Sequence, residues 1–132
     1  MKHVLLSAPV LCLVFLTILF LQSGLDKVFN YKANKDWIDA HFAKSPLKNF
    51  TGLMMPMITV LEVAAGICSA VGIFTLIFAG DNFIGLMGAQ LSCLSILCLF
   101  FGQRIAQDYE GAATLTTYFL ISIASVFLLW NY

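Results

Sequence analysis

The chain has 132 residues, of which 61% are hydrophobic and 11% are charged, and its formal net charge is zero. Soluble domains carry roughly 45–50% apolar and about 25% charged residues, so this composition excludes an ordinary soluble domain and indicates a membrane protein. The sequence has no basic patch or tail that would hold nucleic acid, and this class of partner is excluded as well.

The first predicted element is a helix over residues 4–29. Its apolar run, Val4 to about Leu21, is long enough to cross a bilayer core about 30 Å thick. The run exceeds the roughly 7–15 residues of a signal-peptide core, and no clear cleavage site follows it, so we expect a retained transmembrane helix. The helix ends in the polar stretch "FLQSGLDKVFNY" (Phe20–Tyr31), where Gln22 and Asp26 share one face.

The first loop, about residues 30–52, is longer than a simple connection requires. Its stretch "NKDWIDAHFAKSP" predicts a short interfacial helix that Asn34 caps and that ends at Ser45-Pro46. The aromatic and charged residues lie on different sides of this helix, so we expect its aromatic side to face lipid and its charged side to face water.

A second transmembrane helix is predicted over residues 55–78, with Pro56 in its first turn, where a missing N–H does little harm. The spacing of Thr59, Glu62, Gly66 and Ser69 places all four on one face. Glu62 is the only acidic residue well inside a predicted span, about 10 Å below the start of the helix. A charge at mid-membrane costs ~2.5–3.5 kcal/mol on insertion scales, so a functional role is the first hypothesis for it.

The third and fourth helices are predicted over residues 83–103 and 109–130. A tight turn at Gly80-Asp81-Asn82 precedes the third, and Asp108 is expected to cap the fourth. Short connections make neighbouring helices antiparallel. The predicted fold is therefore all-α: one four-helix up-down membrane bundle over residues 1–132, with a short interfacial helix in loop 1.

Polar residues of the four helices are predicted to gather in the half of the bundle beneath loops 1 and 3. They are Gln22, Asp26, Lys27, Glu62, Arg104, Asp108 and Tyr118; Gln90 lies earlier on the third helix, in rough alignment with Arg104. We expect a polar cleft there, and an ion pair that joins Lys27 or Arg104 to Asp26, Glu62 or Asp108. The simpler alternatives are the polar end of a helix for Asp26 and Lys27, and interhelical hydrogen bonding for Gln90.

Charge asymmetry predicts the orientation. Six Lys or Arg residues lie on the side of loops 1 and 3, and only Lys2 lies on the side of the termini, which places these loops in the cytoplasm. The four cysteines lie in apolar runs without a CxxC and are expected to be small buried hydrophobes. No haem, flavin or metal motif is present, and neither His3 nor His41 lies within a predicted span.

The chain resembles the DoxX family of small four-helix membrane proteins. The resemblance covers nearly the whole length and rests on "FLQSGLDKVFN", "LEVAAGI" and "GQRIAQDYEGAATLTTYF", with the Gly24–Lys27 spacing and the Glu62–Gly66 pair. It implies an integral protein of a bacterial inner membrane. It also implies a link to quinone-dependent thiosulfate oxidation or to membrane-associated redox and thiol-stress complexes.

The first functional hypothesis is therefore a membrane subunit of a quinone-linked redox complex rather than an enzyme acting alone. Glu62 would accept a proton, and Lys27 or Arg104 would polarise a quinone carbonyl. The quinone head would be bound by residues around them: Gln22, Asp26, Gln90, Asp108 and Tyr118.

Two alternatives stay open. The bundle could be a non-enzymatic accessory or assembly subunit that docks a protein partner through loop 1, or a homo-oligomer. It could also carry a small solute or lipid, although no inverted repeat or broken helix pair supports a transporter.

Overall fold

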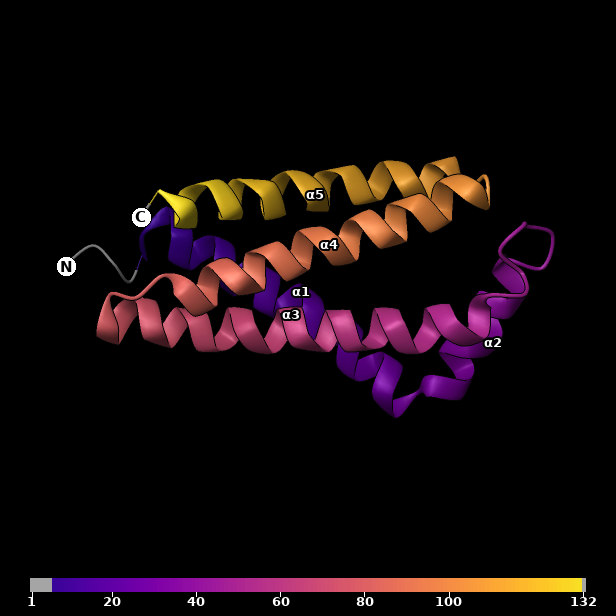
Figure 1. The fold of residues 1–132 in the computed structure, drawn as a ribbon, viewed down its shortest axis with the longest axis horizontal. Helices are drawn as coiled ribbons and strands as arrows, with labels where there is room; N and C mark the ends of the chain where they lie inside the picture. The colour runs from indigo at the N-terminus through magenta and orange to yellow at the C-terminus, as the bar shows by residue number, and fades with distance from the viewer. Residues whose placement is uncertain (1–5, 132) are drawn as a thin grey trace.

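The computed structural model describes residues 6–131. This part of the chain forms helices and no strands. The helices are α1 (Ala8–Phe29), α2 (Tyr31–His41), α3 (Thr51–Ala79), α4 (Phe83–Ile105) and α5 (Tyr109–Trp130). Helices α1, α3, α4 and α5 are long and apolar enough to cross a membrane, which confirms the predicted all-α membrane bundle (Figure 1). In Figure 1, α1 begins and α5 ends at the same end of the bundle, and α2 lies at the opposite end.

The helix boundaries agree with the prediction for α5 and for the start of α4. The predicted start of the first helix, at residue 4, lies outside the described residues. Helix α3 begins at Thr51, four residues before the predicted start, so Pro56 lies in its second turn and not in its first. Pro56 has no N–H, so α3 loses only the backbone hydrogen bond to the carbonyl of Gly52. The space around Gly52 is open, because a methyl group added there would meet nothing within 4 Å.

The connection between α3 and α4 is the predicted tight turn. Gly80 adopts the left-handed conformation (φ +66°), and the backbone N–H of Asp81 donates to the carbonyl of Thr75 at 3.2 Å. This arrangement satisfies carbonyls at the end of α3. Asn82 Nδ2 donates to the carbonyl of Leu129 at 2.6 Å, which ties the turn to the last residues of α5.

Small residues bring the backbones of α1 and α3 together. A methyl group on Gly66 would lie 2.9 Å from the backbone N of Leu21, and one on Gly24 would lie 3.0 Å from that of Val63. Apolar side chains gain little by leaving lipid for each other, so close backbone packing is a main source of helix association in a membrane. These two glycines thus fix how α1 crosses α3.

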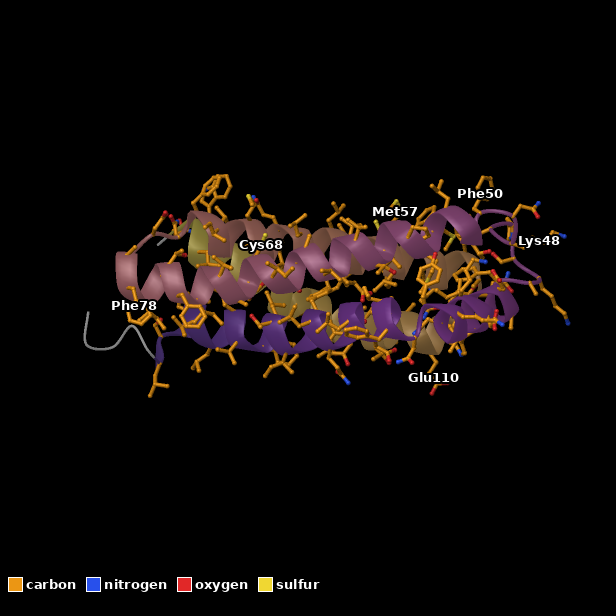
Figure 2. The ribbon with its side chains drawn as sticks, turned by 90° about the horizontal axis from the view of Figure 1, so that it is seen from below. Lys48, Phe50, Met57, Cys68, Phe78 and Glu110 are labelled. Atoms are coloured by element: carbon orange, nitrogen blue, oxygen red, sulfur yellow. The ribbon has the colours of Figure 1, made fainter. Side chains whose placement is uncertain are left out.

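Helix α3 approaches α4 in the same way about one turn further along. A methyl group on Gly88 would lie 2.6 Å from the backbone N of Ser69. The buried hydrophobic residues between the helices include Leu13, Leu16, Phe20, Leu76 and Ile96. Large side chains on the outside, such as Phe78 (79% exposed), face the bilayer that spanning helices require (Figure 2).

Helix α2 departs from the predicted loop helix at both ends. It begins at Tyr31, directly after Asn30, and ends at His41. Asn34 lies inside the helix and does not cap it; its side chain instead donates to Asp26 Oδ2 at 3.1 Å. The loop is anchored to α3 at Asp39, whose Oδ1 accepts from Thr51 Oγ1 at 2.6 Å.

The loop anchor at Asp39 is also charged. Lys35 Nζ lies 2.8 Å from its carboxylate. Hydrogen bonds from Lys35 and then Thr51 lower the pKa of Asp39 below its usual value. This carboxylate therefore stays ionised at neutral pH and joins α2 to the first turn of α3.

The glycine contact between α3 and α4 can be tested with Gly72→Ala. The added methyl would lie 2.4 Å from Gly85 Cα and 2.6 Å from its backbone N, and backbone cannot move aside as a side chain can. We expect a loss of about 1–3 kcal/mol in the free energy of unfolding, measured by denaturant titration in detergent. Gly52→Ala is the control, because nothing lies within 4 Å of its added methyl. Equal stability of the two variants would contradict the packing described here.

Candidate functional site

A buried ion pair joins α1 to α3. Lys27 Nζ lies 3.1 Å from Glu62 Oε2 and donates to Ser23 Oγ at 2.8 Å. The Glu62 side chain is 2% exposed and that of Lys27 is 15% exposed. The predicted ion pair is therefore confirmed, and the Thr59, Glu62, Gly66 and Ser69 stripe is buried as expected.

The early start of α3 changes the distance of Glu62 from the end of the helix. Glu62 is the twelfth residue of α3 and lies about 16 Å along the axis from Thr51, whereas the predicted start near Met55 gave about 10 Å. Lys27 is opposite because α1 and α3 run antiparallel, and Gly24 lies one turn before it, at the close approach to Val63. The glycine contacts and the ion pair thus belong to one interface.

The other predicted site residues do not join this pair. Gln22 and Asp26 lie on an exposed face of α1, where Asp26 Oδ1 accepts from Asn30 at 2.9 Å. Gln90 is exposed on α4. Gln22 and Asp26 share a half of the bundle with Glu62, but helical rotation turns them to another face, and Gln90 lies nearer the Gly80 turn.

The residues near the third loop make separate contacts. Arg104 is exposed, and its guanidinium lies 4.6 Å from the ring centre of Tyr109. Tyr118 is half-buried and lies 6.4 Å from Phe15, centre to centre. Asp108 caps α5 as predicted, with Oδ1 accepting from the Gly111 N–H at 3.0 Å.

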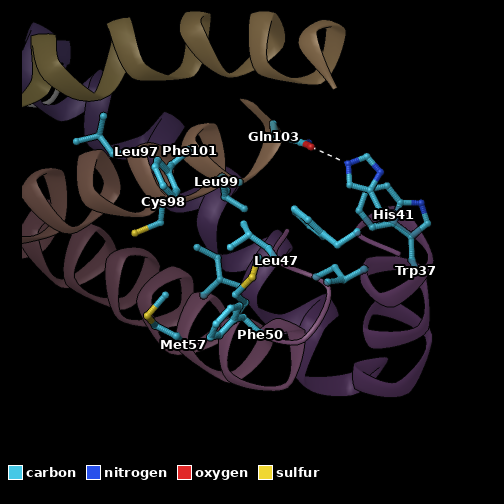
Figure 3. Close-up of a pocket in the computed structure, with 15 residues that line it drawn as sticks. Trp37, His41, Leu47, Phe50, Met57, Leu97, Cys98, Leu99, Phe101 and Gln103 are labelled. Atoms are coloured by element: carbon cyan, nitrogen blue, oxygen red, sulfur yellow. Dashed lines mark hydrogen bonds between the residues drawn. The ribbon is translucent and has the colours of Figure 1, made fainter. Parts of the chain in front are cut away.

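The hollow beneath loop 1 is apolar. It has a volume of about 390 Å³ and lies between α2, the following loop, α3 and α4; we call it the loop-1 pocket (Figure 3). Its lining residues are Trp37, Ile38, His41, Phe42, Leu47, Phe50, Met54, Met57, Ile58, Leu97, Cys98, Leu99, Phe101, Gly102 and Gln103. Glu62, Lys27 and Arg104 are not among them. The predicted polar cleft is wrong in composition, because the charged residues are paired or turned outward.

The same pocket corrects the prediction for α2. Phe42 is buried, and Ile38 and His41 line the pocket together with it. The apolar side of α2 therefore covers α3 and α4 instead of facing lipid. It does so because a helix that starts at Tyr31 and is held at Asp39 by Thr51 turns this side inward.

One edge of the loop-1 pocket is polar. His41 Nε2 lies 2.8 Å from Gln103 Oε1 and 3.4 Å from Asp108 Oδ2 (Figure 3). The amide oxygen only accepts, so Nε2 carries the hydrogen when this bond forms. The imidazole also stacks on Trp37, with ring centres 4.6 Å apart. His41 thus connects α2 to the end of α4 and the start of α5.

Sequence reasoning missed His41, Gln103 and Ser23. The sequence places His41 and Trp37 on one side of the loop helix and outside the predicted spans, which excludes a haem ligand but does not predict the contact of His41 with Gln103. Ser23 lies four residues before Lys27, a spacing that was a signal that the two share a helix face. Gln103 gave no comparable signal, because its partner lies 62 residues away.

The chemistry available to the pocket follows from its walls. Aromatic and aliphatic side chains favour a planar, largely apolar molecule, and one hydrogen-bonding edge can orient it. Among residues 6–131 no three His, Cys, Asp or Glu side chains are grouped as a metal site would require.

The Lys27–Glu62 pair can be tested by a double-mutant cycle. Lys27→Met and Glu62→Gln should each cost about 3 kcal/mol of unfolding free energy, because each leaves a partner buried and unpaired. Their combination should cost about 1–3 kcal/mol less than the sum. The control cycle is the pair of Lys35 and Asp39, where water solvates both groups and the coupling should be far smaller. Additive effects at Lys27 and Glu62 would show that the pair contributes no coupling.

Comparison with known proteins identifies a family. The family model DoxX matches residues 10–94, well over half of the chain, from the first turn of α1 to the middle of α4. Searches of the curated proteins and of the solved structures found no significant match. The matched region contains both members of the buried ion pair and the stretches "FLQSGLDKVFN" and "LEVAAGI", and it confirms the family; the third stretch of the resemblance, residues 102–119, lies beyond it. The chain is a member of the DoxX family.

Proposed function

We propose that this DoxX protein is a membrane subunit of a quinone-linked redox complex, and that the quinone head binds in the loop-1 pocket. The observation that carries the proposal is the pocket itself: a hollow of about 390 Å³ with apolar and aromatic walls and a polar edge at His41 and Gln103. This volume lies in the range of about 300–1,000 Å³ that small-molecule sites occupy.

A quinone head matches these walls. It is planar and apolar, with carbonyl oxygens that accept hydrogen bonds. The N–H of His41 now donates to Gln103 Oε1 and would donate to a carbonyl that displaces this oxygen. Trp37 and Phe101 line the pocket, and their rings can pack face to face or edge to face with a quinone ring.

Reduction of a quinone takes up two electrons and two protons. The electrons would come from a redox centre on a partner protein, and the protons from water. Asp108, whose side chain is 31% exposed, is within reach of both water and His41 and is placed to pass protons on.

Direct participation of Glu62, with Lys27 or Arg104 polarising a carbonyl, is a competing form of the same hypothesis. The engagement of Glu62 by Lys27, and its absence from the pocket walls, favour a structural role for the pair instead. The two forms differ in one result: in protein shown to remain folded, Glu62→Gln abolishes quinone binding only if Glu62 belongs to the site.

The proposal includes a location and an orientation. Loops 1 and 3 would face the cytoplasm of a bacterial cell, with the bundle in the inner membrane. The excess of Lys and Arg at this end of the bundle supports that orientation. In Figure 2, Lys48 and Glu110 lie toward the same end, opposite Phe78.

A second candidate is an accessory subunit without a bound quinone. It is favoured by the exposed charges of loop 1, among them Lys32, Asp36, Lys44 and Lys48, which suit a polar protein surface. The experiment below separates it from the first.

The test uses quenching of Trp37 fluorescence by quinone in lipid nanodiscs. The chain has two tryptophans, and Trp130 lies at the far end of α5, about 32 Å from Tyr109 along the helix. In a Trp130→Phe background we expect saturable quenching. His41→Phe should weaken binding about tenfold through loss of one hydrogen bond.

Trp37→Phe, which leaves only Trp130, is the control and should show no saturable quenching. Absence of quenching in the Trp130→Phe protein would overturn the proposal and leave the accessory role as the better account. Equal binding by the His41→Phe variant would remove His41 from the site.

A further inference from the structure

We infer that the hydrocarbon tail of the bound quinone leaves the loop-1 pocket across Leu97 and lies in a second pocket between α4 and α5. The inference rests on the proposed function and adds the path of the ligand's tail.

The second pocket has a volume of about 310 Å³. Its walls are aliphatic or aromatic except for one threonine. The residues are Ile96, Leu97 and Phe100 of α4 with Leu115, Thr116, Phe119 and Leu120 of α5. The hydroxyl of Thr116 donates to the carbonyl of Ala113 at 2.6 Å, so its hydrogen-bond donor is already used.

The two pockets share one lining residue, Leu97. This side chain lines both of them and is itself 50% exposed on α4. Further along the helix, Phe101 lines the loop-1 pocket and Phe100 lines the second pocket. The proposed tail path follows this exposed stretch of α4 from one pocket to the other.

The chemistry of the two pockets assigns the ends of the ligand. The loop-1 pocket has the polar edge at His41 and suits the head. The side chains that line the second pocket offer no free hydrogen-bond donor, so this pocket suits a hydrocarbon. Lipid tails and the walls of this pocket are similarly apolar, so moving a prenyl chain from lipid into the pocket gains little from the hydrophobic effect. The van der Waals contacts between the chain and the pocket walls therefore decide the affinity of the tail.

The test compares two quinones with the same head, one with a single prenyl unit and one with eight. Binding is followed by Trp37 quenching in the Trp130→Phe protein and expressed as mole fraction in the lipid, which corrects for partitioning. We expect the long-tailed quinone to bind about tenfold more tightly. Thr116→Phe fills the second pocket and should reduce long-tail binding to the short-tail value without changing short-tail binding.

Thr117→Phe is the matched control, because Thr117 is the adjacent exposed residue and lines neither pocket. A second pair guards against misfolding of Thr116→Phe. It consists of Leu120→Phe, at an exposed residue that lines only the second pocket, and Leu94→Phe, since Leu94 is exposed (47%) and lines neither pocket.

The outcomes separate the two claims. Equal affinity for both tail lengths, or equal effects of Thr116→Phe and Thr117→Phe, would overturn the tail path while short-tail binding upholds the head site. That result would fit a phospholipid acyl chain in the second pocket. Failure of both quinones to quench Trp37 would overturn the proposed function and this inference together.

Discussion

The contact between α1 and α3 is the constraint on which the rest of the structure depends. Gly24 and Gly66 bring the two backbones close enough for Lys27 to reach Glu62 across the interface. A membrane supplies little hydrophobic drive for helix association, so such contacts and the buried pair decide which helices pack and in what register. Removing one charge would leave the other unpaired in a medium that solvates it poorly.

This contact also determines where α2 lies. Helix α1 ends two residues after Lys27, and α2 begins just after Asn30. On the opposite helix, eleven residues of α3 precede Glu62 and extend beyond the end of α1. Helix α2 and the loop after it lie along that remaining part of α3 and enclose the loop-1 pocket. His41 then connects this cover to α4 and α5 through Gln103 and Asp108. The pocket is thus a consequence of α1 being shorter than α3.

The fold could be predicted from the sequence because its strongest signals are local. Four long apolar runs, the Gly80 turn and the Asp108 cap each depend on neighbouring residues. The Lys27–Glu62 pair was also predictable, because the spans contain few charged residues and each therefore has few possible partners.

The composition of the site was not predictable in the same way. Residues at similar depth were expected to meet, but a rotation of about 100° per residue separates Asp26 from Lys27 on the helix surface. The loop-1 pocket depends on which side of α2 turns inward, and this is set by contacts of Asp39 and His41 with residues 12 and 62 positions away. No local pattern encodes such contacts.

We propose that the ligand binds in the apolar pocket beneath α2 and not at the charged pair between α1 and α3. Photolabelling with an azido-quinone in native lipid, followed by peptide mapping, tests it most directly. We expect labels on residues 37–58 and 97–103, which include the lining of the loop-1 pocket, and competition by unmodified quinone. Competable labels confined to α1 and to α3 around Glu62 would contradict it.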